Sequence, residues 1–228
     1  MNSTNQFTRF EDLINGQSEV LQWITHGKPI KSILEKLANF VESQSEAGLI
    51  ASFFCTDEIE KHLFYCAGSN LPIDFITAIN GLTIEANAAS CGTAAFTRKT
   101  IIVENIQQST LWKGYQAVAQ KHNLNACWST PLVNSQGKLR GTFAIYSNAP
   151  GLPTEKDRQL INFVSHTALL AIEFQHAKEA KARFSEREKT HVENARKSEE
   201  RFQNLVREAK VGIVVLRGQD MIVDIVNE

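Results

Sequence analysis

The chain has 228 residues, with 24 basic and 25 acidic side chains and a formal net charge of −1 at pH 7. A balance this even supplies no basic field that would attract nucleic acid. Residues 1–9 are polar, and no apolar run approaches the roughly 20 residues that a membrane-spanning helix needs. We therefore expect a cytoplasmic protein that makes no membrane contact and binds no nucleic acid.

The N-terminal part of the chain predicts a helix followed by a β-hairpin. Apolar residues recur near helical spacing from Glu19 to Ser43, with an interruption at Gly27–Pro29. Residues 49–56 and 62–67 predict two strands, and the polar residues 57–61 predict the turn between them.

The four cysteines, Cys55, Cys66, Cys91 and Cys127, form no C-x-x-C pair. Their spacing is therefore not typical of a zinc site or a redox motif, and we predict no metal. Cys55 and Cys66 lie on consecutive predicted strands and could face each other across the hairpin. Free thiols are nevertheless the prediction, because the expected compartment is reducing.

A stretch of small residues follows a short helical segment at 71–79. Ser90–Phe96 reads Ser-Cys-Gly-Thr-Ala-Ala-Phe and predicts the start of a helix with Ser90 as its cap. The free N–H groups of such a helix start can receive an anion or a ligand carbonyl. Alternatively, the small residues only allow the helix to lie close to a sheet.

The middle of the chain predicts two further strands and one helix. The strands are residues 125–133 and 139–146, the helix is residues 115–122, and residues 101–103 form a short apolar run. Strand pairs followed by helices predict an α+β fold, an antiparallel sheet with helices on its faces. Trp112 and Trp128 each carry one N–H that needs a partner when buried, which is more typical of a core than of a ligand platform.

The longest predicted helix begins at Thr154, with Glu155 and Asp157 in its first turn. Residues spaced alternately by three and four along it predict a parallel homodimeric coiled coil. The apolar members are Leu160, Phe163, Leu170, Phe174, Phe184, Phe202 and Leu205, and the others include Thr167, Ala177, Lys181, Glu188 and His191. The polar middle weakens the pairing and permits two registers of similar energy. The alternative is a solvated single helix or a partly disordered stretch, since residues 178–210 are highly charged.

Several motifs in a fixed order resemble the GAF domains of bacterial sensory kinases. They are Ser90–Phe96, Ile101–Val103, Leu111–Trp112, Ala126–Leu132 and Gly141–Tyr146, and the resemblance covers about residues 17–175. It implies a sheet of five or six strands with a small molecule bound over it, opposite the terminal helices. The implied ligand-binding residues are Cys91, Thr93, Trp112, Cys127, Ser129 and Phe143. The motifs of bilin-binding and cyclic-nucleotide-binding GAF domains are absent, so the ligand and any cofactor remain unknown.

The C-terminal residues resemble the start of a PAS domain. Ser198–Phe202 would form its entry, followed by strands at 211–215 and 221–226. Two strands cannot form an independent core, so we expect the sequence to be a piece of a longer protein. The predicted division is an N-terminal segment (1–16), a GAF domain (17–175), a helical linker (176–210) and the start of a PAS domain (211–228). The resemblance implies a sensor histidine kinase or a cyclic-di-GMP enzyme, whose catalytic core the sequence does not contain.

Two other functions fit the same fold. Cys91 resembles one cysteine of free methionine-(R)-sulfoxide reductases, which are GAF-fold enzymes that attack their substrate with a thiolate. Their other motifs are missing, and Cys127 lies where they carry an acidic residue. The third possibility is an empty dimerisation scaffold.

His166 and His191 lack the context of a kinase phosphoacceptor, and His62 or His122 alone would be a weak haem ligand.

Overall fold

The computed structural model describes residue 16, residues 18–45, 48–68 and 70–208, and the backbone of strands 214–217 and 222–226. The chain forms two compact units, residues 1–176 and 177–228.

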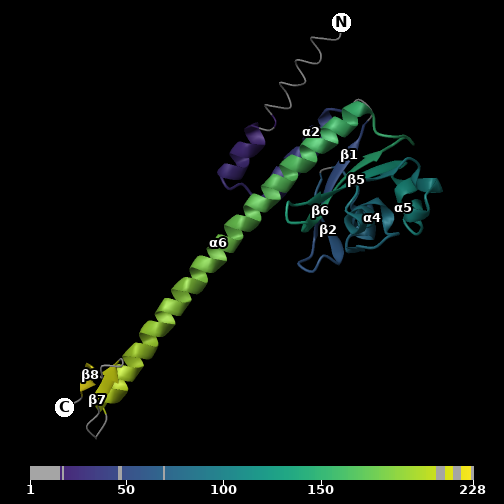
Figure 1. Cartoon of the computed structure of the whole chain (residues 1–228). Coiled ribbons are helices and arrows are strands. Elements are labelled where there is room, and N and C mark those ends of the chain that lie inside the picture. Colours follow the sequence, from purple (N-terminus) through teal and green to yellow (C-terminus); the bar gives the residue numbers. More distant parts are fainter. Residues whose placement is uncertain are drawn as a thin grey trace. The chain divides into compact units, whose positions relative to one another are not determined.

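The first unit is built on one six-stranded antiparallel sheet with the strand order β3-β2-β1-β6-β5-β4 (Figure 1). The strands are β1 (Ile50–Thr56), β2 (His62–Ala67), β3 (Leu82–Thr83), β4 (Ile101–Val103), β5 (Ala126–Val133) and β6 (Leu139–Ser147). This architecture confirms the predicted α+β class and the predicted hairpin.

Helices cover both faces of the sheet (Figure 1). They are α2 (Ile30–Ser43), α3 (Ile73–Ile79), α4 (Ala89–Thr97), α5 (Gln116–Lys121) and α6 (Glu155–Glu208), with two 3-10 turns, η1 (Ile106–Gln108) and η2 (Thr110–Trp112). On one face, α2 and the first turns of α6 bury a core that includes Phe53, Phe143 and Ile145. On the other face, α3, α4, α5 and both 3-10 turns bury a second core. None of the described helices combines the length and apolarity needed to cross a membrane.

The strands divide their side chains between the two cores because successive residues point to opposite faces. In β6, Phe143 and Ile145 belong to the core under α2 and α6, whereas Ala144 and Tyr146 belong to the core under α4. Gly141 is the third residue of β6 and lies opposite Cys55 with a φ of +159°, and a Cβ there would lie 2.0 Å from the Phe54 carbonyl oxygen. The close approach of β1 and β6 therefore requires glycine at this position.

The N-terminal helix is interrupted as predicted. Residues 18–25 are helical, a turn follows, and α2 begins after Pro29. The predicted capping role of Ser90, in contrast, is wrong. The helix α4 begins at Ala89, its N-cap is Ala88 without a side-chain cap, and Ser90 lies inside the first turn.

Cys55 and Cys66 form a disulfide between β1 and β2, with their Cα atoms 5.9 Å apart. The prediction of free thiols at these two positions is therefore wrong. The β1–β2 ladder skips Cys66 at a register shift between Phe53 and Phe54. The predicted hairpin allowed the two cysteines to face each other, but cysteine spacing along the chain does not reveal the register shift beside Cys66.

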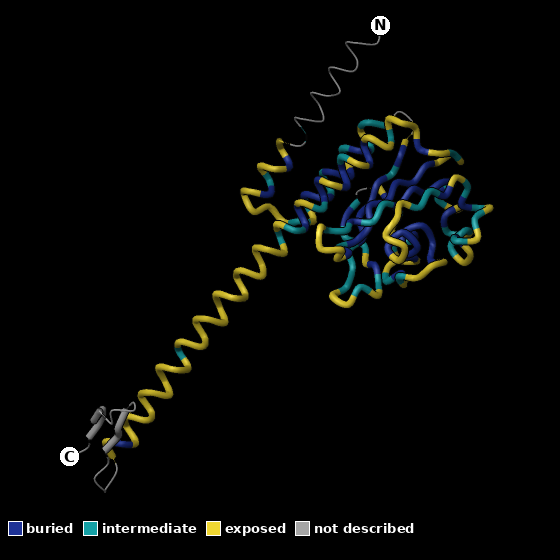
Figure 2. The backbone as a smooth tube through the Cα atoms, in the orientation of Figure 1, coloured by how far each residue is buried: buried dark blue, intermediate teal, exposed yellow. Residues whose placement is uncertain are grey.

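The helix α6 begins with a reciprocal cap. The Asp157 N–H donates to Thr154 Oγ1 at 3.2 Å, and the Thr154 N–H donates to Asp157 Oδ2 at 2.8 Å. Beyond the first unit its side chains are almost uniformly exposed (Figure 2).

The predicted heptad positions of α6 do not share one exposed face. Leu160 and Thr167 are buried against the sheet, at 3% and 4% exposure, whereas Leu170 is exposed. The more C-terminal apolar members of the set are also exposed, namely Phe174, Phe184, Phe202 and Leu205. An intermolecular contact through α6 would therefore have to use the exposed members, because the early positions already pack inside the domain.

The second unit holds the C-terminal part of α6 and an antiparallel hairpin of β7 (Val214–Arg217) and β8 (Ile222–Val226). Two strands were predicted here. Residues 211–213 and 221 of those predictions lie outside the described residues.

Candidate functional site

The candidate site lies on the sheet face that α4 covers. Its strand residues follow the alternation of β1, β5 and β6, and α4 adds one thiol from its first turn. They are Ser52, Cys91, Cys127, Ser129, Thr142 and Tyr146, all of them buried. Because they come from three neighbouring strands and one helix, the fold gathers residues that lie far apart in the sequence.

Cys91 and Cys127 are free thiols, and both are buried. Hydrogen bonding with the Cys127 thiol is the main cause that lowers the pKa of Cys91, to about 7. Burial opposes this shift, while the hydroxyls of Ser129, Thr142 and Tyr146 assist it. Burial raises the pKa of Cys127 well above its ordinary value. The neighbouring hydrogen-bond donors therefore favour the thiolate at Cys91 over the thiolate at Cys127.

Within the part of the chain that the structure describes, four buried hydroxyls of this cluster have no hydrogen-bond partner: Ser52 Oγ, Ser129 Oγ, Thr142 Oγ1 and Tyr146 Oη. An unpaired buried polar group typically costs about 1–3 kcal/mol. Burial also raises the pKa of Tyr146 well above its ordinary value, so its hydroxyl keeps its proton and can donate. The cluster thus offers several hydrogen-bond donors whose one nearby acceptor on the described protein is the Cys91 sulfur, and an acceptor on a bound ligand could also receive them.

Aromatic rings adjoin this hydroxyl cluster. Phe75 lies edge-on to Tyr146 at 5.5 Å between centroids, and Trp112 lies edge-on to Tyr146 at 6.5 Å. The Trp112 indole Nε1–H donates to Ser90 Oγ at 2.9 Å. The indole N–H is thus satisfied within the protein, and Trp112 contributes its ring rather than a hydrogen bond.

Most of the predicted ligand-binding residues lie on this face. Cys91 and Cys127 belong to the core of this face, Ser129 lies on the same face of β5 as Cys127, and Trp112 lies beside Tyr146. Thr93 lies one helical turn along α4 from Ala89, and its hydroxyl donates to the Ala86 carbonyl at 3.2 Å.

Phe143 does not belong to this group, and its prediction as a ligand-binding residue is corrected here. It lies on the opposite face of the sheet and stacks on Phe53 with 4.7 Å between ring centroids. Ser52, Thr142 and Tyr146 were not predicted. The alternation of β6 could have identified the last two, because they share a face with Ala144 and not with Phe143.

β5 connects this site to the start of α6. Trp128 lies between Cys127 and Ser129 but packs on the opposite face, in the core that contains Leu160. Its indole Nε1–H donates to the Gly151 carbonyl at 3.1 Å, in the loop that leads to α6. The Gly151 N–H in turn donates to the Glu104 carbonyl at 2.9 Å. The loop before α6 is therefore hydrogen-bonded to the strands that carry the site.

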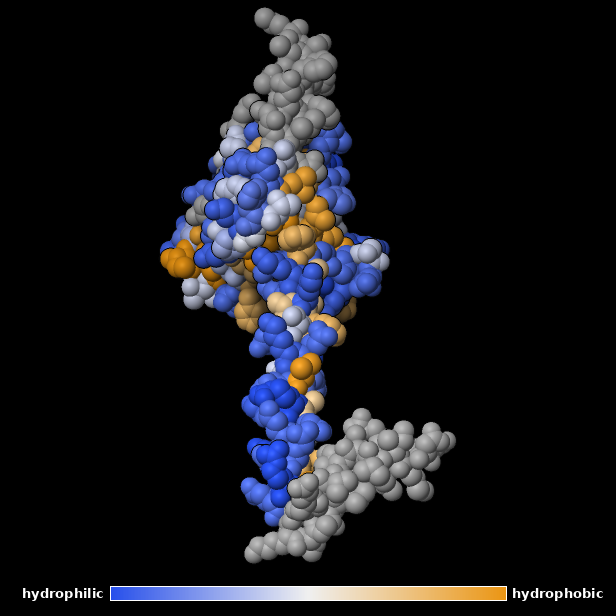
Figure 3. Space-filling view, turned by 90° about the vertical axis from the view of Figure 1, so that its left-hand side faces the viewer, coloured by the Kyte–Doolittle hydropathy of each residue, from blue (hydrophilic) through white to orange (hydrophobic). Residues whose placement is uncertain are grey.

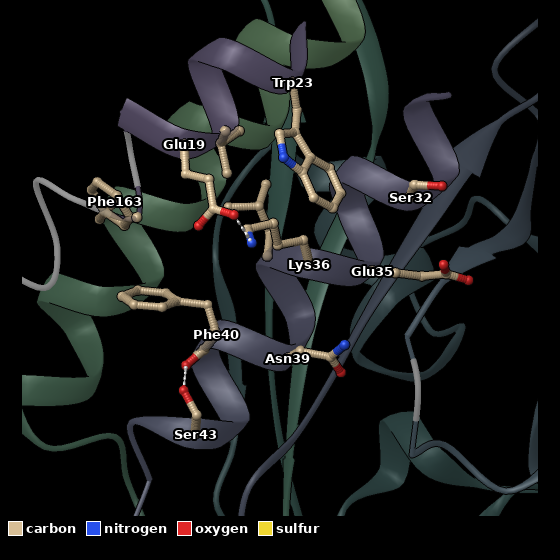
Figure 4. A pocket seen from close by; sticks show the side chains of 12 residues that line it. Glu19, Trp23, Ser32, Glu35, Lys36, Asn39, Phe40, Ser43 and Phe163 are labelled. Atoms are coloured by element: carbon tan, nitrogen blue, oxygen red, sulfur yellow. Dashed lines mark hydrogen bonds and ion pairs between the residues drawn. The ribbon is translucent and has the colours of Figure 1, made fainter. Parts of the chain in front are cut away.

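A second hollow lies outside the sheet, among residues 18–25, α2 and α6 (Figure 4). It has a volume of about 600 Å³, and Trp23, Phe40 and Phe163 supply its aromatic lining. The Lys36 ammonium forms an ion pair with Glu19 and lies 4.6 Å from the centroid of the Trp23 ring. Because Lys36 is already paired with Glu19, its ammonium group is not free to bind an anion in the hollow.

The two histidines considered as haem ligands are engaged with carboxylates. His62 pairs with Asp57 at 3.0 Å, and His122 pairs with Asp74 at 2.7 Å. Within the described residues, no group of three or more cysteine, histidine or acidic side chains could hold a metal ion.

The family model of the GAF domain matches residues 29–173. The chain belongs to the GAF domain family. This GAF chain is 34% identical over 184 residues to the methyl sulfide methyltransferase-associated sensor of Methanosarcina acetivorans. The match covers 81% of the chain but only 18% of that sensor, so the chain spans about a fifth of its relative.

Solved structures share the GAF fold at low sequence identity. The GAF domain of a phosphoenolpyruvate-protein phosphotransferase from Coxiella burnetii matches with a TM-score of 0.59 and 15% identity, over 75% of this chain and 98% of that one. Free methionine-R-sulfoxide reductase from Neisseria meningitidis, in complex with its substrate, matches with a TM-score of 0.57 and 14% identity, over 73% and 89% of the two chains. Identities this low show a shared fold and not a shared function.

Proposed function

We propose that residues 17–175 form a sensory GAF module that binds a small molecule on the α4 face of the sheet. The ligand would contact Cys91, Thr93, Trp112, Cys127 and Ser129, together with the hydroxyls of Ser52, Thr142 and Tyr146. The unpaired buried hydroxyls carry this proposal, because an acceptor on a ligand would satisfy them. The sensor named among the relatives supports a signalling role.

The signal would leave the domain through β5 and α6. A ligand that moves Cys127 or Ser129 also moves Trp128 between them, and Trp128 holds the loop before α6. A ligand shifts this equilibrium only to the extent that it prefers one arrangement of the helix.

A parallel homodimer would carry the signal onward. Apolar side chains interrupt the otherwise hydrophilic surface of α6 (Figure 3), including the exposed Leu170, Phe174 and Phe184. Burying such side chains against a second copy would stabilise the dimer, whereas Lys181 and Glu188 would weaken its middle. The hollow beside Phe163 lies along the same helix.

The remaining features of the proposal concern the longer protein. Residues 176–210 would be a helical linker, and residues 211–228 the start of a PAS domain. The whole would be a cytoplasmic sensor histidine kinase of a two-component system, whose catalytic domains lie beyond this sequence.

Native mass spectrometry of the full chain, compared with its denatured mass, tests the proposal. We expect a dimer carrying a co-purified small molecule. Tyr146→Phe, which removes one unpaired hydroxyl, should lower the bound fraction, and the matched change Tyr115→Phe should not. If the chain is a dimer without a bound ligand, and no compound of a metabolite library shifts its melting temperature, the sensor hypothesis is refuted in favour of the dimerisation scaffold. A monomer would refute the dimer helix.

A reductase remains a second candidate because the Cys91 pKa is lowered to about 7, which leaves a reactive thiolate at neutral pH. The test is consumption of free methionine-(R)-sulfoxide with a dithiol reductant. Turnover that Cys91→Ser abolishes would support the enzyme, and the absence of turnover by the folded chain would exclude it.

A further inference from the structure

The buried thiols Cys91 and Cys127 form a chemically unusual pair. Cys91 lies in the first turn of α4 and Cys127 lies on β5, and both belong to the same buried core. Hydrogen bonding with the Cys127 thiol lowers the pKa of Cys91. Their exposures are only 3% and 0%. A buried cysteine normally packs as a small hydrophobe among apolar groups. Here the pair also lies in an apolar core, but three hydroxyls of the neighbouring strands adjoin the Cys91 sulfur.

Three hydroxyls without another partner surround Cys91, namely those of Ser129, Thr142 and Tyr146. A hydroxyl donates a stronger hydrogen bond to an anion than to a neutral thiol. The hydroxyls of Ser129, Thr142 and Tyr146 therefore gain an acceptor when the Cys91 thiol becomes a thiolate. The arrangement favours a nucleophilic sulfur at Cys91 and a protonated one at Cys127.

We propose that Cys91 is a peroxide-reactive nucleophile and that Cys127 is the thiol that resolves its oxidised form into a disulfide. Burial of both sulfurs selects small, uncharged oxidants, of which hydrogen peroxide is the simplest. This inference rests on the proposed sensory function, because it adds a second input, oxidation, to the same ligand site.

The reaction balances with two electrons taken from the two sulfurs. The Cys91 thiolate attacks one oxygen of hydrogen peroxide, the O–O bond breaks, and Cys91 becomes a sulfenic acid as hydroxide leaves. That hydroxide takes the proton of the Cys127 thiol and becomes water. The Cys127 thiolate then attacks the Cys91 sulfur, the S–S bond forms, and the S–O bond breaks with loss of a second hydroxide.

The disulfide changes the site in two ways. It removes the anion, so that the hydroxyls of Ser129, Thr142 and Tyr146 again lack an acceptor. It also fixes the sulfurs of α4 and β5 at the covalent distance of about 2.05 Å. Oxidation should therefore alter ligand affinity at this face of the sheet.

The test treats the reduced full chain with one equivalent of hydrogen peroxide, alkylates the remaining thiols under denaturing conditions and maps the peptides by mass spectrometry. We expect a cross-linked peptide joining Cys91 to Cys127, which mapping distinguishes from Cys55–Cys66. In Cys127→Ser, dimedone should label Cys91. Recovery of both site thiols in alkylated form, or dimedone labelling of Cys127 in Cys91→Ser, would overturn the proposal.

A rate comparison tests the role of the hydroxyls. Tyr146→Phe should slow the oxidation of Cys91 by roughly tenfold, whereas Tyr115→Phe should leave the rate unchanged. Equal rates of Cys91 oxidation in the Tyr146→Phe and Tyr115→Phe proteins would refute a thiolate stabilised by the Tyr146 hydroxyl. The cross-linking experiment uses the wild-type chain, so its outcome does not depend on whether a variant folds.

Ligand binding by the reduced chain separates this inference from the sensory function. A chain that binds a ligand but forms no cross-link refutes only the peroxide site. A chain that forms the cross-link but binds no ligand refutes the small-molecule sensor and keeps the thiol chemistry.

Discussion

The hydrogen bond between Trp112 and Ser90 should contribute measurably to the stability of the GAF domain. Trp112 is 1% exposed, and its indole N–H has Ser90 Oγ as acceptor at 2.9 Å. Ser90→Ala leaves that N–H buried and unpaired, which should cost about 1–3 kcal/mol. A domain of this size loses about 2–4 °C in Tm for each kcal/mol, so Tm should fall by roughly 2 to 12 °C.

Urea unfolding followed by tryptophan fluorescence measures this loss. All three tryptophans, Trp23, Trp112 and Trp128, belong to the first unit, so the signal reports that unit alone. Ser43→Ala is the matched control, because its exposed hydroxyl donates to the Phe40 carbonyl and should be nearly neutral when removed.

A double-mutant cycle with Trp112→Phe isolates the pair, because the cost of Ser90→Ala should nearly vanish once the indole N–H is gone. A Ser90→Ala protein within about 0.5 kcal/mol of wild type would contradict the reasoning.

Three further predictions concern the rest of the sheet. Phe143→Ala should cost about 3–5 kcal/mol by urea unfolding, yet folded protein should keep its ligand, since Phe143 lies on the far face. Gly141→Ala should prevent folding, judged by circular dichroism, because its Cβ would lie 2.0 Å from the Phe54 oxygen. The hydrogen bond from Arg140 lowers the pKa of Glu173 in the folded protein. The ionised Glu173 therefore stabilises the fold fully above the pKa of an unfolded glutamate, about 4.3, and this stabilisation is lost as pH falls through the pKa of the folded state. The stability difference between wild type and Glu173→Gln, about 0.5–1 kcal/mol for this partly buried pair, should therefore shrink in acid.

The strands and helices could be predicted because they depend on local patterns. Alternating and apolar runs define β1, β2, β5 and β6, and Thr154 with Asp157 defines the start of α6. The order of small-residue motifs was enough to indicate the fold.

The errors concern properties that depend on register or on packing. Strand alternation places Phe143 and Tyr146 on opposite faces of β6, but only the packing of the helices shows which of the two faces carries the site. Cys55 and Cys66 pair beside a register shift between Phe53 and Phe54, and the residue types around this shift do not predict it. Leu160 fits a heptad as well as Leu170 does, and it is the sheet beneath α6 that buries the first and leaves the second exposed.

The two faces of β5 carry an evolutionary consequence. Cys127 and Ser129 point toward the site, while Trp128 between them holds the loop before α6. If the proposed sensory function holds, substitutions at positions 127 and 129 would change the ligand that the domain binds and leave the contact between Trp128 and the loop before α6 intact. Such a strand would let related sensors acquire new ligands while they retain the same output.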